Sequence, residues 1–203
     1  MLLLSVAAVP AVGDTILVVG DSISAAYNIP LDAGWVSLLR ERLEERRPGQ
    51  YQVINASISG DTTAGGADRL PGLLAKHNPD KVVLELGGND GLRGLSLKRM
   101  EANLQRMIDL SRGAGARVVL ISVQLPVSYG KFFLERYNDV FERLARRNDL
   151  PLASLGYGLL DDPSLVQSDG IHPTAEAQPL LVDALWPYIV GKSQEQAREA
   201  RQS

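Results

Sequence analysis

The sequence predicts a three-layer α/β/α fold of the flavodoxin-like type, with a five-stranded parallel sheet in the order 2-1-3-4-5. Short apolar runs alternate with longer amphipathic segments along the chain, a pattern typical of repeated strand-helix units. The apolar runs are rich in β-branched residues and mostly continuous, as in strands that are covered on both faces. Right-handed helical crossovers between parallel strands make this strand order the simplest arrangement.

One domain is expected over residues 14–191, because a chain of 203 residues suits a single hydrophobic core. The predicted strands, in chain order, cover residues 15–19, 52–55, 81–86, 117–123 and 150–153. Apolar residues at helical spacing predict helices near residues 33–47, 62–77, 97–113 and 131–148. A last helix is expected after Pro173, and Pro179 within it indicates a late start or a kink.

Both ends of the chain differ in composition from this domain. Residues 1–11 are small and apolar, and the sequence at 9–11 resembles the small-residue cleavage site of an export signal, although a positively charged start is lacking. We therefore expect a signal or leader segment and a periplasmic or secreted protein, with a cytoplasmic protein as the alternative. Residues 192–203 are polar and charged, which predicts a solvated tail.

Composition argues against several classes of function. The net charge of -3 comes without a basic stripe, so no nucleic-acid partner is expected. The chain has no cysteine and only two histidines, His77 and His172, which argues against disulfides, thiolate chemistry and a histidine-built metal centre. No run reaches the roughly 18 apolar residues of a membrane span. We expect a monomer without metal or cofactor and without stable membrane insertion, acting on a small-molecule substrate.

Polar motifs follow several of the predicted strands at their carboxyl ends. Ser22, Gly60 and Asn89 come after the first, second and third strands, respectively. In the predicted order these strands are neighbours about 4.8 Å apart, so the three residues should meet at the switch point where such sheets bind ligands. Asp169 and His172 follow the fifth strand, about 14 Å from the first, and the intervening loop is long enough to bring them back.

These five residues supply the groups that acyl transfer from an ester requires. Ser22 offers a nucleophilic hydroxyl, His172 a general base, and Asp169 a carboxylate that orients the base. The backbone N–H groups of Ser22 and Gly60 and the side-chain amide of Asn89 can donate to an oxyanion. A structural interpretation as a helix cap or turn residue is also open to four of them taken alone, Ser22, Asn89, Asp169 and His172, so the combination carries the prediction.

The second histidine, His77, ends a predicted amphipathic helix, where a cation suits the helix dipole, and we interpret it as a surface residue. This leaves His172 as the candidate base. The motif Gly-x-Ser-x-Gly is absent around Ser22, because residue 24 is a serine, so the α/β-hydrolase architecture is not indicated. A different serine-hydrolase fold is expected.

Long stretches around these motifs, residues 55–62, 85–94 and 169–173, resemble the SGNH, or GDSL-type, hydrolases. The likeness spans about Ile16 to Tyr188. It is greatest to a bacterial subgroup of multifunctional enzymes described as thioesterase, protease and lysophospholipase, together with related arylesterases. It implies Ser22 as nucleophile with Asp169 and His172 as its partners. The resemblance further implies an oxyanion hole formed by Ser22, Gly60 and Asn89, a mobile loop at 91–95 over an acyl groove, and export.

The expected substrates are oxyesters and thioesters of fatty acyl groups. Apolar residues in the loops after the third and fourth strands could line a groove for the acyl chain; the candidates are Leu92, Leu95, Leu125 and Tyr129, with Val127, Phe132 and Phe133 as further ones. The two phenylalanines could instead only pack the following helix. A carbohydrate acetylesterase of the same fold is the alternative activity.

Two other classes of protein fit the sequence less well than a hydrolase. Asp21 and Asp90 could imitate the carboxylates of a phosphoacceptor receiver domain, but no lysine occurs in the loop after the fifth strand, as that class would need. A flavin- or nucleotide-binding module is disfavoured because no phosphate-cradling glycine motif follows a strand. We interpret Asp21 and Asp90 as carboxylates that organise loops by accepting backbone N–H bonds. Glu85 lies within an apolar strand without an evident partner.

Overall fold

The structure, a computed structural model, describes residues 13–155 and 162–191, so the expected leader and tail lie outside the described residues. Its centre is a five-stranded sheet in the order β2-β1-β3-β4-β5, and every neighbouring pair is parallel. The strands are β1 (Asp14–Gly20), β2 (Tyr51–Asn55), β3 (Lys81–Glu85), β4 (Arg117–Val123) and β5 (Leu152–Leu155). The predicted fold class and strand order are confirmed.

The α-helices are α1 (Trp35–Arg46), α2 (Thr63–His77), α3 (Gly88–Leu92), α4 (Leu97–Gly113), α5 (Lys131–Asn148) and α6 (Gln178–Ile189). Three short 3-10 helices are η1 (Leu31–Ala33), η2 (Val127–Tyr129) and η3 (Pro163–Leu165). The predicted helices at 33–47, 62–77, 97–113 and 131–148 agree with the structure to within two residues at each end. Pro179 lies in the first turn of α6, where proline is tolerated, so it marks a late start.

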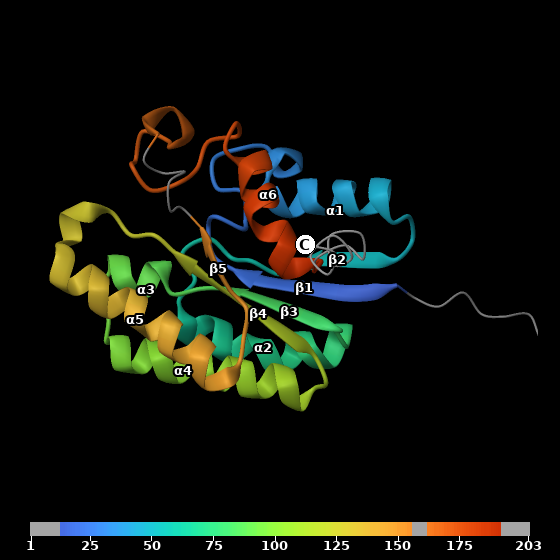
Figure 1. The fold of residues 1–203 in the computed structure, drawn as a ribbon, viewed down its shortest axis with the longest axis horizontal. Helices are drawn as coiled ribbons and strands as arrows, with labels where there is room; N and C mark the ends of the chain where they lie inside the picture. The colour runs from blue at the N-terminus through green and yellow to red at the C-terminus, as the bar shows by residue number, and fades with distance from the viewer. Residues whose placement is uncertain (1–12, 156–161, 192–203) are drawn as a thin grey trace, which may run out of the picture.

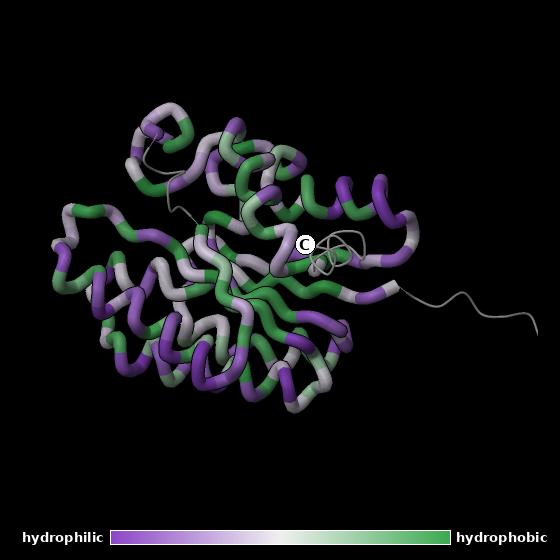
Figure 2. Tube along the Cα trace, viewed as in Figure 1, coloured by the Kyte–Doolittle hydropathy of each residue, from purple (hydrophilic) through white to green (hydrophobic). Residues whose placement is uncertain are grey.

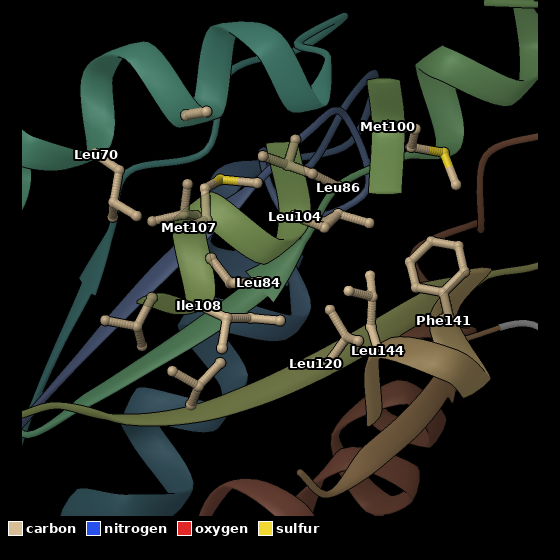
Figure 3. Packing of buried hydrophobic residues seen from close by; sticks show 14 of the residues in the cluster. Leu70, Leu84, Leu86, Met100, Leu104, Met107, Ile108, Leu120, Phe141 and Leu144 are labelled. Carbon is tan, nitrogen blue, oxygen red and sulfur yellow. The ribbon is translucent and has the colours of Figure 1, made fainter. Parts of the chain in front are cut away.

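Helices cover both faces of the sheet, with α1 and α6 on one face and α2, α4 and α5 on the other (Figure 1). The hydropathy colouring shows mostly apolar strands at the centre and helices in which hydrophilic and hydrophobic residues alternate along the chain (Figure 2). The larger core cluster fills the α2/α4/α5 side, where Leu84 and Leu120 of the sheet meet Leu104, Met107 and Phe141 of the helices (Figure 3). Residues of both faces are buried, which explains the continuous apolar runs.

The carboxyl ends of β1, β2 and β3 are held close together. In the sheet register, Gly20 at the end of β1 lies opposite Glu85 at the end of β3. The chain after β2 continues beside β1, since the backbone N–H of Ile58 donates to the carbonyl of Gly20 at 3.1 Å. Three loops therefore leave the sheet side by side at this edge.

Among the described helices, none is long and apolar enough to span a membrane.

Candidate active site

Ser22 lies in a helical turn that directly follows β1. The carbonyl of Asp21 accepts from the backbone N–H of Ala25 at 2.9 Å, and the carbonyl of Ser22 accepts from that of Tyr27 at 3.0 Å. These bonds place Ser22 in the first turn after the strand, at the carboxyl edge of the sheet. None of the hydrogen bonds formed among the described residues uses the backbone N–H of Ser22.

A tight turn at 169–172 presents the imidazole of His172. The Oδ1 atom of Asp169 accepts from the backbone N–H groups of Ile171 at 2.9 Å and His172 at 3.0 Å, and Gly170 adopts a left-handed φ of 69°. The turn brings the Asp169 Oδ2 atom to 2.6 Å from Nδ1 of His172. Nε2 of the same ring lies 2.7 Å from Oγ of Ser22. With a proton on Nδ1, Nε2 is free to accept the proton of Ser22.

The electrostatics of Asp169 suit a carboxylate that stays ionised. Partial burial alone would raise the pKa of Asp169, but hydrogen bonds from the backbone and side chain of His172 and from Ile171 outweigh it and lower the pKa. The ionised carboxylate favours a proton on Nδ1 and stabilises an imidazolium when Nε2 also takes a proton.

Two residues that the sequence does not single out hold His172 against the turn that carries Ser22. The ring of Tyr27 lies against the imidazole, with 4.5 Å between ring centroids. Gln167 links the two loops, because its Nε2 atom donates to the carbonyls of Tyr27 and Pro173, both at 3.0 Å. Its Oε1 atom accepts from Asn28 at 3.0 Å. Spacing gives no signal for Gln167, since its partner loop is about 140 positions away in the chain.

Asn89 is held by the short helix α3 at the end of β3. Its Nδ2 atom donates to Oδ2 of Asp21 at 3.0 Å, which ties it to the turn that carries Ser22. The preceding glycines permit this close approach: Gly87 has a φ of 120°, and a Cβ at Gly88 would lie only 3.2 Å from Oδ2 of Asp21. Asn89 thus lies beside the turn that carries Ser22, as the strand order predicts.

Gly60 lies in the turn after β2 with a left-handed φ of 79°, and its carbonyl accepts from Nη2 of Arg93 at 2.8 Å. The same Nη2 lies 3.5 Å from Oδ1 of Asn89. Arg93 therefore joins the loops that carry two of the predicted oxyanion donors. The sequence does not single out Arg93, although its position four residues after Asn89 on a helical segment could have indicated it. Among the described residues, the backbone N–H of Gly60 has no hydrogen-bond partner.

Asp21 and Asp90 both organise loops, as expected. Oδ1 of Asp21 accepts from the backbone N–H of Ile23 at 3.2 Å. Asp90 accepts from the backbone N–H of Thr63 at 2.9 Å and from its hydroxyl at 2.6 Å, which joins α3 to the start of α2. Burial raises the pKa of Asp21 to about 6, against the opposing effects of hydrogen bonds from Ile23 and Asn89.

The predicted acyl-chain residues differ in exposure. Leu95 is 44% exposed, and Tyr129 is 39% exposed and donates from its hydroxyl to the carbonyl of Leu92 at 2.9 Å. Leu92 is half-buried and packs on the core. Leu125 is only 3% exposed and packs against Gly91, so it supports α3 from within the core, contrary to the expectation that it lines a groove. Its position after β4 made it look like a loop residue.

Of the further candidates for the acyl groove, Val127 and Phe132 are exposed, and Phe133 lies between the rings of Tyr129 and Tyr137.

His77 is the last residue of α2, which leads into the amino end of β3, so it lies at the opposite edge of the sheet from Ser22. Within the described ranges, no three histidine, aspartate or glutamate side chains form a group that could hold a metal ion.

Comparison with known proteins agrees with the motifs. The family model of the GDSL-like lipase/acylhydrolases matches residues 18–179. The esterase TesA of Pseudomonas aeruginosa is 45% identical over 180 residues, covering 88% of this chain and 89% of that protein. The thioesterase 1/protease 1/lysophospholipase L1 of Escherichia coli K12 is 38% identical over 177 residues, covering 85% and 82%.

A crystal structure provides a further match. The psychrotrophic esterase EstA from Pseudoalteromonas sp., in a form inhibited by monoethylphosphonate, superposes with a TM-score of 0.82 at 35% identity, covering 87% of this chain and 96% of that one. The region matched by the family model, residues 18–179, contains Ser22, Gly60, Asn89, Asp169 and His172. The chain belongs to the GDSL-like lipase/acylhydrolase family and is an enzyme that hydrolyses ester or thioester bonds.

Proposed function

We propose that the chain is a serine hydrolase of acyl esters and thioesters in which Ser22 forms the acyl-enzyme. The continuous hydrogen-bonded chain from Oγ of Ser22 to His172 at 2.7 Å, and from His172 to Asp169 at 2.6 Å, carries this proposal. A serine hydroxyl is a weak nucleophile by itself, and a neutral imidazole at this distance is the group that activates it.

In the first half-reaction, Oγ of Ser22 attacks the carbonyl carbon and its proton passes to Nε2 of His172. The tetrahedral intermediate then collapses, the bond to the leaving oxygen or sulfur breaks, and His172 returns the proton to the leaving group. In the second half-reaction, water attacks the acyl-enzyme with His172 as base, and Ser22 regains its proton as the carboxylic acid forms. Asp169 stabilises the imidazolium in both halves.

The oxyanion is proposed to be held by the backbone N–H groups of Ser22 and Gly60 and by the side-chain amide of Asn89. The two backbone donors have no other partner among the described residues. The amide carries two N–H groups, so one can donate to Asp21 while the other donates to the oxyanion. Fixed donors of this kind stabilise charge that develops only in the transition state.

The substrates are proposed to be fatty acyl oxyesters and thioesters. The attack forms the same oxyanion whether oxygen or sulfur leaves, so one site can serve both. The names of the relatives, an esterase and a thioesterase with lysophospholipase activity, support this breadth. Leu92, Leu95 and Tyr129 are proposed to line the acyl groove, with Leu125 beneath them.

The remaining proposals concern the whole protein. We propose residues 14–191 as the catalytic domain, residues 1–11 as a signal segment, residues 192–203 as a polar tail, and a monomeric protein exported to the periplasm. The composition of the segment at 1–11 supports export. Determination of the amino-terminal residue of the protein isolated from its host tests this proposal, since removal of the segment is expected and a retained Met1 in a cytoplasmic fraction would contradict it.

Labelling with an organophosphonate tests the central proposal. Wild-type protein is expected to gain the mass of one phosphonyl group on Ser22 and to lose ester hydrolysis in parallel. Ser22→Ala should gain no such mass and should hydrolyse neither an oxyester nor a thioester, while its circular dichroism stays that of the wild type. Labelling of another serine in the Ser22→Ala protein would overturn the assignment of the nucleophile.

A further inference from the structure

Glu85 is a buried carboxyl group directly beneath the turn at 21–24, which carries the proposed nucleophile Ser22 and is called the nucleophile turn below. It is the last residue of β3 and its exposed fraction is 0%. Its Oε2 atom accepts from the backbone N–H of Asp21 at 3.2 Å and from the hydroxyl of Ser24 at 2.6 Å. One acidic oxygen thus holds the residue immediately before Ser22 and the residue two positions after it.

The hydroxyl of Ser24 is bonded to Trp35 as well as to Glu85. The indole Nε1 of Trp35 lies 3.2 Å from Oγ of Ser24 and can only donate. Ser24 accepts this bond from Trp35, and its own hydroxyl proton is the donor to Oε2 of Glu85. Oε2 acts as an acceptor for both of its partners, and the other oxygen, Oε1, has no hydrogen-bond partner among the described residues.

Close packing leaves this arrangement little freedom. A Cβ at Gly20 would lie 2.6 Å from Oε2 of Glu85 and 2.7 Å from Oγ of Ser24, so only glycine at this position lets the carboxyl approach the turn. Trp35 is held in turn, because its backbone N–H donates to Oε1 of the buried Gln178 at 3.0 Å. The network thus connects the end of β3 and the starts of α1 and α6 to the nucleophile turn.

We propose that Glu85 is a positioning residue for the nucleophile: as a neutral acid, its Oε2 atom holds the turn at 21–24 in the conformation that directs the Ser22 hydroxyl and backbone N–H toward the substrate. The inference rests on the proposed role of Ser22. Glu85 itself does not touch the reacting atoms.

The surroundings favour the neutral form of this carboxyl. Burial raises the pKa of Glu85 well above its ordinary value, and the nearby Asp21 carboxylate raises it further, while the hydrogen bond from Ser24 opposes both. Arg69, whose guanidinium reaches the carbonyl of Gly20, forms its ion pair with Asp61 at 2.8 Å. No cation among the described residues pairs with Glu85. A proton on Oε1 leaves Oε2 as the acceptor that both donors need.

Conservative and disruptive variants of Glu85 and Ser24 distinguish a role in positioning Ser22 from a role in the stability of the fold alone. Glu85→Gln keeps an acceptor oxygen without charge, so its kcat and pH profile should stay within about threefold of the wild type, given one neutral hydrogen bond in place of another. Glu85→Ala removes the acceptor, and the displaced serine should lower kcat by about 10²-fold with little change in KM. Ser24→Ala, which keeps the carboxyl, should lower kcat by about five- to tenfold.

Ser111→Ala is the matched control, because Ser111 is also a fully buried serine that donates one hydrogen bond, to the carbonyl of Met107 at 2.8 Å in α4. It should lower thermal stability as Ser24→Ala does but leave kcat unchanged. The rate of phosphonylation of Ser22, measured on the folded protein, should follow kcat across the series.

The outcomes are distinct. Wild-type kcat and wild-type phosphonylation in Glu85→Ala would overturn the positioning role, and a loss in Glu85→Gln as large as in Glu85→Ala would overturn the neutral form. Should Glu85→Ala fail to fold, equal kcat in Ser24→Ala and Ser111→Ala would overturn the inference. Phosphonylation at a residue other than Ser22 in the wild type would instead overturn the proposed function.

Discussion

The side-chain amide of Asn89 donates a hydrogen bond to the carboxyl group of Asp21 at 3.0 Å, across two loops that leave different strands. The bond joins a predicted oxyanion donor to the residue next to the predicted nucleophile. It also orients the amide before substrate arrives, because the N–H that faces Asp21 determines where the second N–H points. Preorganisation of this kind lowers the cost of stabilising a transition-state charge.

Asn89→Ala is expected to lower kcat by roughly 10²–10³-fold with little effect on KM, since the donor serves a charge that exists mainly in the transition state. Steady-state kinetics with an oxyester and a thioester of the same acyl chain would measure it. A change confined to KM would instead make Asn89 a residue that binds the ground state.

Asp21→Asn should also lower kcat, by about 10–10²-fold. Both oxygens of Asp21 accept a hydrogen bond, one from Ile23 and one from Asn89, and an amide in their place offers a single acceptor oxygen. Since both substitutions act through the same amide, the double variant Asp21→Asn/Asn89→Ala should be little worse than Asn89→Ala alone. Effects on kcat that multiply fully would show that Asp21 acts independently of Asn89.

Stability should depend on pH through the buried carboxyl of Asp21. Its pKa is raised to about 6 by burial, so between about pH 4 and pH 6 the folded state binds more protons than the unfolded state. The contribution of Asp21 is present below pH 4 and is lost as pH rises through 6, on the order of 1–3 kcal/mol of unfolding free energy. Urea unfolding at pH 4.5, 5.5, 6.5 and 7.5 would measure the slope.

Asp21→Asn provides the comparison for this slope, because it cannot titrate. Its unfolding free energy should change less between pH 4.5 and pH 6.5 than that of the wild type, whatever its absolute stability. Carboxyls whose pKa is lowered, such as Asp169, act in the other direction and lose their contribution only at more acidic pH. Identical slopes in the two proteins would contradict the raised pKa of Asp21.

The two histidines should differ completely in their effect on activity. Hydrolysis should fall at acid pH, because an imidazole must be neutral to accept the Ser22 proton, and His172→Ala should lose nearly all activity. His77→Ala is the control and should keep both the rate and the pH profile, since His77 lies at the opposite edge of the sheet. Lost activity in a well-folded His77→Ala protein would refute the assignment of the base.

Acyl-chain preference tests the proposed groove. From acetyl through hexanoyl to decanoyl derivatives, kcat/KM should rise for both oxygen and sulfur leaving groups, because each methylene buried in the groove contributes up to about 0.8 kcal/mol. Replacement of the exposed Leu95 by Ser should flatten the rise and leave acetyl hydrolysis unchanged. A preference for acetate, particularly on a sugar, would favour the carbohydrate acetylesterase instead.

The sequence by itself determined the fold and the identity of the main polar groups. The strands appear in the sequence as continuous β-branched runs because both faces of the sheet are covered, and the helices are predicted by the spacing of apolar residues. Both signals are local in the chain. Strand order then followed from a chirality rule, and it brought Ser22, Gly60 and Asn89 to one edge without knowledge of any contact.

Tertiary structure alone decided which residues hold the polar groups of the site in place and which of the surrounding residues are buried. Gln167 contacts Tyr27, and Arg93 contacts Gly60, across chain separations that no periodicity encodes. Leu125 looked like a loop residue but lies in the core, because burial depends on what packs above it. The state of Glu85 depends on the donor-only indole of Trp35 in α1 and on a serine and a second carboxyl in the turn after β1. Proton affinity responds to distance in space and to desolvation, which the linear order of residues does not contain.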